Sequence, residues 1–293
     1  MENKAPIPYK RVVLLGHTGF FGKALFRIFQ GTGAAVRGLG SADLDLRRFE
    51  RMAVLDDVAD ADTVLIVASA LTPDKGATLE VLQDNLQMYL NLGRYLETHP
   101  VGLCVYISSD AVYPFRGIPV TEESPVEPAS IYALGKYSGE RILARQAEVK
   151  GLPLLNLRLT ALYGPGDTHG SYGPNSFIRS LVKDKTVRIF GQGEEQRDHL
   201  HVDDAARLVC RLVGAKATGT YNLATGKSQS FAHVVDVLRR VVPEPFDLVS
   251  APRKAPVTHR HFDVTKLFLQ VPGFEYTPIE EGLAAYYRSS VRA

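Results

Sequence analysis

A tyrosine, a lysine and a serine have the types and spacing that proton transfer at a hydroxyl group requires. Tyr132 and Lys136 are four residues apart in a stretch that predicts a helix, so their side chains share one face. A nearby ammonium favours the phenolate and lowers the pKa of a tyrosine. Ser109 follows a predicted strand and could hydrogen-bond the same substrate oxygen. Tyr132 could then act as general base or acid while a bound nicotinamide exchanges a hydride. The alternative is an ordinary surface pair.

The residues that could hold such a cofactor lie in the stretch RVVLLGHTGFFGKALFRIFQ, residues 11–30. Residues 12–15 are all apolar, as in a strand that is buried on both faces. Gly16, Gly19 and Gly22 follow with the spacing G-x-x-G-x-x-G, and apolar residues then recur at helical spacing. Strand, glycine turn and helix together let backbone N–H groups approach a pyrophosphate. The alternative is a turn that only eases the packing of the helix on the strand.

The rest of the chain predicts the elements that would position these residues. We expect strands at residues 12–15, 34–39, 62–68, 102–108 and 154–159, and helices at residues 48–55, 79–99 and 131–150. Strands that alternate with helices predict an α/β fold with a Rossmann-like, doubly wound parallel sheet. Beyond residue 166 the elements become short and mixed, which predicts a smaller C-terminal α/β substrate-binding lobe. We therefore expect an NAD(P)-binding domain at residues 1–166 and the smaller lobe at residues 167–293, with a soft boundary.

Composition narrows the possible functions. The 293 residues include 34 Lys and Arg and 32 Asp and Glu, a net charge of +2, so we expect no nucleic-acid or membrane partner. No apolar run is long enough to span a bilayer, and the N-terminus has no apolar signal segment. Cys104 and Cys210 lie in apolar stretches and predict buried thiols in a cytoplasmic protein. His199 and His201 lack the spacing of a ligand set, so we expect no metal.

Taken together, the motifs resemble those of the extended short-chain dehydrogenase/reductases, the NAD-dependent epimerase/dehydratase group that acts mostly on nucleotide sugars. The similar segments are GHTGFFG at residues 16–22, ISSDAVYP at 107–114, YALGK at 132–136, RDHLHVDD at 197–204 and TGTYNLATG at 218–226. The resemblance covers nearly the whole chain, and no motif singles out one reaction.

The resemblance implies a set of site residues. Ser109, Tyr132 and Lys136 would be catalytic, and Asn85 would hold a water next to the lysine. Arg197 would meet the substrate diphosphate, and we expect further substrate contacts from Ser109, Asp110 and Asn175. For NAD or NADP we expect contacts from Gly16, Thr18, Gly19, Phe20, Phe21, Gly22, Asp45, Leu46, Ala68, Ser69, Ala70, Tyr132 and Lys136.

Departures from the family pattern bear on the reaction. No acidic residue follows Leu39 to hold the adenosine ribose, which weakens the case for strict NAD use. Ala111 stands where 4,6-dehydratases carry a glutamate, which argues against elimination of water, and Ala161 replaces an asparagine that usually contacts the diphosphate.

We expect a nucleotide-sugar epimerase that works through a keto intermediate. The alternatives are an NADPH-dependent reductase of a 4-keto nucleotide sugar, an enzyme acting on a non-nucleotide substrate, and a non-catalytic NAD(P)-binding protein. The family also implies a homodimer formed through residues 79–99 and 131–150.

Overall fold

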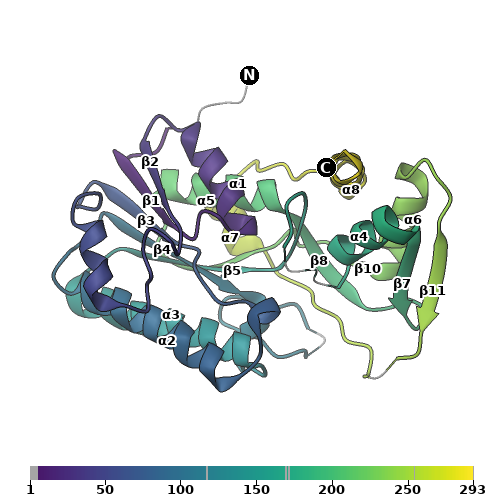
Figure 1. Cartoon of the computed structure of the whole chain (residues 1–293), viewed down its shortest axis with the longest axis horizontal. Coiled ribbons are helices and arrows are strands. Elements are labelled where there is room, and N and C mark those ends of the chain that lie inside the picture. The colour runs from purple at the N-terminus through teal and green to yellow at the C-terminus, as the bar shows by residue number, and fades with distance from the viewer. Residues whose placement is uncertain (1–5, 117, 169, 171, 254, 293) are drawn as a thin grey trace.

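The computed structural model describes residues 6–116, 118–168, 170, 172–253 and 255–292. Its central element is a parallel sheet of six strands in the order β2-β1-β3-β4-β5-β9. The strands are β1 (Arg11–Leu15), β2 (Ala35–Leu39), β3 (Thr63–Val67), β4 (Leu103–Ser109), β5 (Leu154–Leu159) and β9 (Gly219–Leu223). This order and the helices on both faces confirm the Rossmann-like, doubly wound fold (Figure 1).

Helices cover the sheet on both faces. One face carries α1 (Phe20–Gln30) and α5 (Val202–Gly214), and the other carries α2 (Leu79–Leu96) and α3 (Ile131–Lys150) (Figure 1). Alternate residues of β1 explain its apolar run: Val12 and Leu14 join the core under α1 and α5, whereas Val13 and Leu15 join the core under α2. Strands buried on both faces therefore appear in the sequence as continuous apolar runs.

A second group of elements lies beside the main sheet, at the carboxyl ends of its parallel strands (Figure 1). A three-stranded sheet has the order β10-β8-β6, and a pair β11-β7 packs with α4, α6 and α8. The bounds are β6 (Ala161–Tyr163), α4 (Pro174–Asp184), β7 (Thr186–Phe190), β8 (Gln196–His201), β10 (Ser228–Ser230), α6 (Phe231–Val241), β11 (Asp247–Ala251), α7 (Thr265–Gln270) and α8 (Ile279–Val291). Strand β9 lies beyond residue 166 but pairs with β5 of the first sheet, so the chain crosses between the two groups. The division at residue 166 stays a prediction.

Several local predictions need correction. Residues 48–55 form a 3₁₀ helix, Phe49–Leu55, and two more short 3₁₀ helices occur at Pro73–Lys75 and Asp110–Val112. Residues 243–256, which include four prolines, contain strand β11. Both cysteines are free and buried, as predicted.

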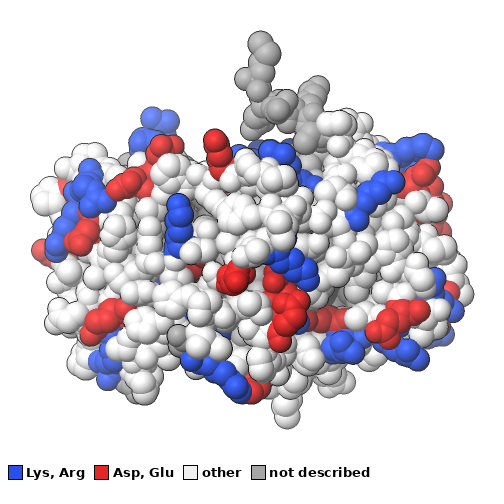
Figure 2. Space-filling model, turned by 180° about the vertical axis from the view of Figure 1, so that it is seen from behind, with Lys and Arg blue, Asp and Glu red and all other residues white. Residues whose placement is uncertain are grey.

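On the face shown in Figure 2, Lys and Arg side chains lie interspersed with Asp and Glu. Within the described ranges, no helix is both long and apolar enough to cross a membrane, and no group of metal-ligating side chains is present.

Candidate active site

A cavity of about 330 Å³ lies where the carboxyl ends of the main strands meet the second group of elements. The glycine turn after β1 forms one wall, and Ser109, Tyr132 and Lys136 form another. The cavity therefore brings the predicted cofactor turn and the three predicted catalytic side chains together. Its other lining residues include Phe20, Phe21, Ala68, Ala70, Asp110, Thr160, Ala161, Asp167 and Asn175.

The glycine turn is shaped by close backbone contacts. Gly16 has φ +86°, a conformation that favours glycine. A Cβ on Gly22 would lie only 2.1 Å from the carbonyl oxygen of Gly16, so any larger residue would push α1 away from the turn. No described side chain caps the helix at Gly19. The first turn of α1 thus faces the cavity without a capping side chain, and this arrangement fits a pyrophosphate.

Tyr132 differs from the prediction in its ionisation. Burial raises the pKa of Tyr132 to about 12, and a hydrogen bond with Ser109 only partly opposes this effect. The Lys136 ammonium lies 6.0 Å from the centroid of the Tyr132 ring and donates to the carbonyl oxygen of Ile107 at 2.9 Å. The expectation that Lys136 lowers the pKa of Tyr132 is therefore wrong for this arrangement, because the ammonium bonds to the backbone of β4.

Lys136 is itself strongly affected by its surroundings. Its side chain is almost fully buried, and burial lowers the pKa of Lys136 to about 8. The carboxylate of Glu140, one turn further along α3, acts in the opposite direction and favours the charged form. Lys136 therefore titrates close to neutral pH, as groups at functional sites often do.

Asn85 is bonded to the backbone of the segment that follows β3, and its role in holding a water stays a prediction. Its Oδ1 accepts a hydrogen bond from the Leu71 amide at 2.8 Å, and its Nδ2 donates to the Leu71 carbonyl at 3.0 Å. Both polar atoms thus bind the backbone of the segment that follows β3. Asn85 positions that segment, which includes the cavity residue Ala70.

Asn175 and Arg197, two of the residues predicted to contact substrate, form hydrogen bonds within the protein. Asn175 lines the cavity, but its amide bonds to the backbone of Leu162 at 3.0 Å and of Gly164 at 3.2 Å. Arg197 donates to the carbonyl of Thr258 at 2.7 Å and to its hydroxyl at 2.9 Å. Arg197 is not among the residues that line the cavity.

Four predicted cofactor contacts lie outside the cavity lining: Thr18, Asp45, Leu46 and Ser69. The Asp45 carboxylate accepts hydrogen bonds from Arg47 at 3.0 Å, which hold the pKa of Asp45 below its usual range. Leu46 is buried in the apolar core under α2. Local pairing and core packing therefore occupy Asp45 and Leu46, which the sequence alone could not reveal.

The structure adds two residues near the cavity that sequence reasoning did not assign to the site. Arg260 is buried, donates to the carbonyls of Tyr113 and Pro114 at 3.0 Å each, and places its Nε 3.7 Å from the Asp110 carboxylate. Burial raises the pKa of Asp110, while Arg260 and Arg197 act in the opposite direction. Arg260 was missed because it lies 146 residues from Pro114 in sequence.

His199 is the second addition. It lies opposite Ala161 in the register of β6 and β8, so it neighbours the cavity wall. Its ring is buried, and neither ring nitrogen has a hydrogen-bond partner among the described residues. Burial and the charge of Arg197 lower the pKa of His199 to about 3, so the imidazole is neutral at physiological pH.

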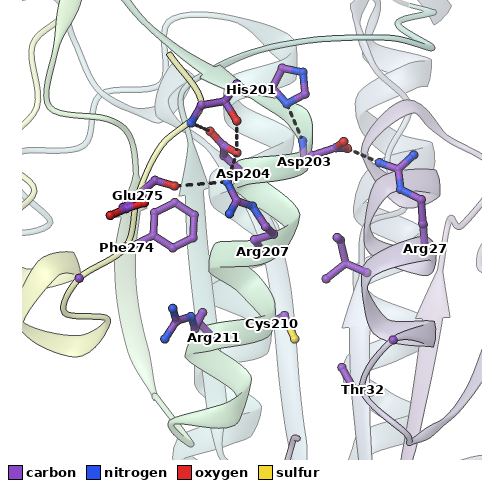
Figure 3. A pocket seen from close by; sticks show the side chains of 14 residues that line it. Arg27, Thr32, His201, Asp203, Asp204, Arg207, Cys210, Arg211, Phe274 and Glu275 are labelled. Atoms are coloured by element: carbon purple, nitrogen blue, oxygen red, sulfur yellow. Dashed lines mark hydrogen bonds and ion pairs between the residues drawn. The ribbon is translucent and has the colours of Figure 1, made fainter. Parts of the chain in front are cut away.

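A second, larger cavity of about 800 Å³ lies between α1, α5 and residues 273–277 (Figure 3). Asp203 pairs with Arg27 of α1, and Asp204 pairs with Arg207. Asp204 also accepts hydrogen bonds from the amide and hydroxyl of Thr277 at 2.7 and 2.8 Å. These contacts brace the C-terminal segment against α5, and they leave few charges on these walls without a partner inside the protein.

Comparisons with known proteins agree with this geometry. A putative UDP-glucose 4-epimerase of Methanocaldococcus jannaschii is 29% identical over 182 residues, which cover 60% of this chain and 59% of that protein. The chain therefore spans about three fifths of that relative's length. The structure of UDP-glucose 4-epimerase from Thermus thermophilus with NAD has a TM-score of 0.83 at 20% identity and covers 95% of this chain and 98% of its own.

A second solved structure, RMD from Pseudomonas aeruginosa complexed with NADPH, has a TM-score of 0.84 at 22% identity and covers 97% of this chain and 99% of its own. At these identities the two structures show a shared fold. The model of the NAD dependent epimerase/dehydratase family matches residues 12–224, which is most of the chain. The chain belongs to the NAD dependent epimerase/dehydratase family.

Proposed function

We propose that the protein is an NAD(P)-dependent nucleotide-sugar epimerase that moves a hydride at a hydroxyl-bearing sugar carbon. The observation that carries the proposal is one cavity lined by Ser109, Tyr132, Lys136 and the glycine turn. Family membership and the relative from Methanocaldococcus jannaschii, which is named a putative UDP-glucose 4-epimerase, support it. Solved neighbours bind NAD in one case and NADPH in another, which supports a dinucleotide in the glycine turn.

The chain's own residues would handle the proton. A bound NAD(P) supplies the acceptor and donor of the hydride. Tyr132 takes the hydroxyl proton while the sugar carbon becomes a keto group, and it returns that proton when the hydride is added to the other face. Ser109, hydrogen-bonded to Tyr132, orients the reacting oxygen. Lys136 lines the same cavity as the glycine turn, where its positive charge would favour binding of the anionic dinucleotide.

An NADPH-dependent reductase of a 4-keto nucleotide sugar is the second candidate, and two observations favour it. Strand β2 ends at Leu39 without an acidic residue directly after it. The next carboxylate in the sequence, that of Asp43, accepts a hydrogen bond from the Gly40 amide at 2.8 Å. With a pKa of about 12, Tyr132 also keeps its proton at neutral pH and is ready to donate it to a ketone oxygen. A non-catalytic NAD(P)-binding protein ranks lower, because all three catalytic side chains are present.

The test begins with the purified protein. After denaturation, the released small molecules are identified by absorbance and mass. Recovered NAD favours an epimerase that recycles its own hydride, whereas an empty protein that prefers NADPH favours the reductase. Thermal shifts with UDP, dTDP, GDP and CDP then select the nucleotide, because a specific ligand stabilises the folded state. Sugars carrying that nucleotide are assayed for turnover. The enzymatic proposal fails if none of them reacts with either cofactor.

We also propose that the protein forms a homodimer through α2 and α3. Leu79, Leu90, Leu134 and Val149 are exposed on these two helices, and Leu79 is 70% accessible. Isolated apolar residues are common on protein surfaces, so this observation supports the family-based expectation without carrying it. Gel filtration at working concentration decides between monomer and dimer.

A further inference from the structure

A buried ion pair lies directly behind the proposed catalytic residues. Glu140 of α3 and Arg158 of β5 are both nearly inaccessible. Arg158 donates from Nε to Oε1 of Glu140 at 3.0 Å and from Nη2 to Oε2 at 2.7 Å, which makes the pair bidentate. Nη1 of Arg158 also donates to the Tyr113 hydroxyl at 2.7 Å. A fully bonded pair of this kind holds its two charges in fixed positions.

The ion pair connects to the catalytic residues through two elements. Along α3, Glu140 lies one turn after Lys136, so the two side chains share a helix face. On β4, the Ser108 hydroxyl donates a hydrogen bond to Glu140. The two residues that flank Ser108 also reach the site: the Ile107 carbonyl accepts a hydrogen bond from Lys136, and Ser109 lines the cavity. A change at Glu140 is therefore transmitted to Lys136 both through space and through the end of β4.

The surroundings of Lys136 offer few other charges. Its ammonium lies 5.4 Å from the ring centroid of Tyr106 on β4 and 6.0 Å from that of Tyr132 on α3. The ammonium donates its hydrogen bond to the uncharged Ile107 carbonyl. Among the described residues, Glu140 is the carboxylate that favours the charged form of Lys136. Arg158 is bound to that same carboxylate at 2.7 Å.

We propose that Glu140 is a positioning residue that keeps Lys136 charged, and that Arg158 limits the strength of this effect. The proposal deepens the proposed function, since it rests on Lys136 serving the cofactor cavity. Its physical basis is that a buried ammonium needs a nearby negative charge to keep its proton. An ion pair that acts only as a structural brace makes a different prediction, because removing either partner then has the same kind of effect.

Cofactor affinity as a function of pH tests the proposal without any sugar substrate. Lys136 lines the cavity together with the glycine turn, so its positive charge favours binding of an anionic dinucleotide. The dissociation constants of NADH and NADPH are measured by nicotinamide fluorescence from pH 6 to pH 10. For the unaltered protein we expect affinity to fall as pH rises through about 8, where Lys136 loses its proton.

Two variants should move that midpoint in opposite directions. Glu140→Gln removes the negative charge and should lower the midpoint by about one pH unit. Arg158→Met leaves the carboxylate unpaired and should raise the midpoint by a similar amount, about one pH unit. Glu148→Gln is the matched control, because Glu148 lies on the same helix in an exposed pair with Arg145 at 3.4 Å. It should leave the midpoint unchanged.

Folding is controlled separately, because breaking a buried pair is strongly destabilising. The melting temperature of each variant is recorded, and Glu140→Asp, which keeps the charge, should retain the original midpoint. If Glu140→Gln does not fold, the double variant Glu140→Gln/Arg158→Met is compared with Arg158→Met alone and should show the lower midpoint. Shifts in the same direction for both single variants, or no shift in any, overturn the proposal. Lack of sugar turnover would defeat the proposed function and leave these binding curves intact.

Discussion

The two sides of the cleft differ in how their buried polar groups are satisfied. On the side built from β4, α3 and β5, Lys136, Glu140 and Arg158 all have hydrogen-bond partners within the protein. On the side built from β8 and its neighbours, both ring nitrogens of His199 and the Nε of Arg260 have none among the described residues. The charged groups of the first side are paired within the protein, whereas the second side keeps a buried imidazole and a guanidinium nitrogen without hydrogen-bond partners among the described residues.

This difference has an energetic meaning. A buried polar atom without a partner costs about 1–3 kcal/mol, so such atoms need an explanation in a folded protein. Groups that position a reacting proton must be held before substrate arrives, which suits the side whose charged groups are paired. Atoms that bond to a ligand must give up few bonds when it arrives, which suits the ring nitrogens of His199 and the Nε of Arg260. The comparison thus separates residues whose replacement should disturb the site from His199, whose replacement should stabilise the fold.

The largest effect is expected at Tyr132. Tyr132→Phe removes the proton donor and acceptor, and we expect turnover to fall by about 10²–10⁴-fold while cofactor still binds. Steady-state assays and cofactor titration measure the two quantities separately. Tyr137→Phe is the control, because Tyr137 lies on the same helix, is partly buried and belongs to a separate apolar cluster. Near-normal turnover of Tyr132→Phe would remove Tyr132 from the proposed mechanism.

The glycine turn between β1 and α1 should be the next most sensitive position. In Gly22→Ala the new Cβ would lie 2.1 Å from the Gly16 carbonyl, so α1 must shift. We expect a loss of about 1–3 kcal/mol in the free energy of unfolding, as for other overpacked sites. Cofactor affinity should also fall at least tenfold. Chemical denaturation and cofactor titration measure both effects.

Gly19→Ala is the matched control for that change. A Cβ on Gly19 meets only the Gly16 carbonyl, at 3.4 Å, and its backbone φ of −72° suits any residue. Its stability should stay within about 0.5 kcal/mol of the unaltered protein. Equal losses in the two variants would mean that the turn's composition matters and the close approach at Gly22 does not.

The sequence predicted the main sheet and the glycine turn better than it predicted the second group of elements. The main strands were predictable because strands buried on both faces read as apolar runs, as residues 63–67 do. The glycine turn and the shared face of Tyr132 and Lys136 depend on local spacing, which the sequence contains. No strand was predicted at β8, because its sequence QRDHLH is mostly polar. Its residues are buried by contacts with distant segments.

The sequence also could not predict which partners the side chains of the site would bond to. The pair Tyr132 and Lys136 was found by spacing, but nothing local indicates that Lys136 bonds to the Ile107 carbonyl, 29 residues away. Likewise, Arg197 bonds to Thr258, 61 residues further along the chain. Burial then reverses the expected pKa shift of Tyr132. Helix spacing fixes which residues are neighbours, whereas tertiary packing decides which atoms meet.

The smallest effect at neutral pH, and the only stabilising one, is expected at His199. His199→Phe replaces an unpartnered buried ring by an apolar one beside Phe231, whose ring centroid lies 5.7 Å away. We expect the free energy of unfolding to rise by about 1–2 kcal/mol. Binding of the nucleotide selected by thermal shift should weaken. His233→Phe, which removes an exposed histidine from α6 in the same region, is the control.

Acid extends the same prediction, because the folded state holds the pKa of His199 at about 3, below the usual 6.5. Between these values the unfolded chain binds a proton that the folded protein does not, so stability falls as pH drops below 6.5. The advantage of His199→Phe should therefore widen from pH 6.5 towards pH 4 in denaturation experiments. An advantage that is the same at both pH values would mean that the imidazole finds a partner in solution. The contrast between the two sides of the cleft would then rest on Arg260 alone.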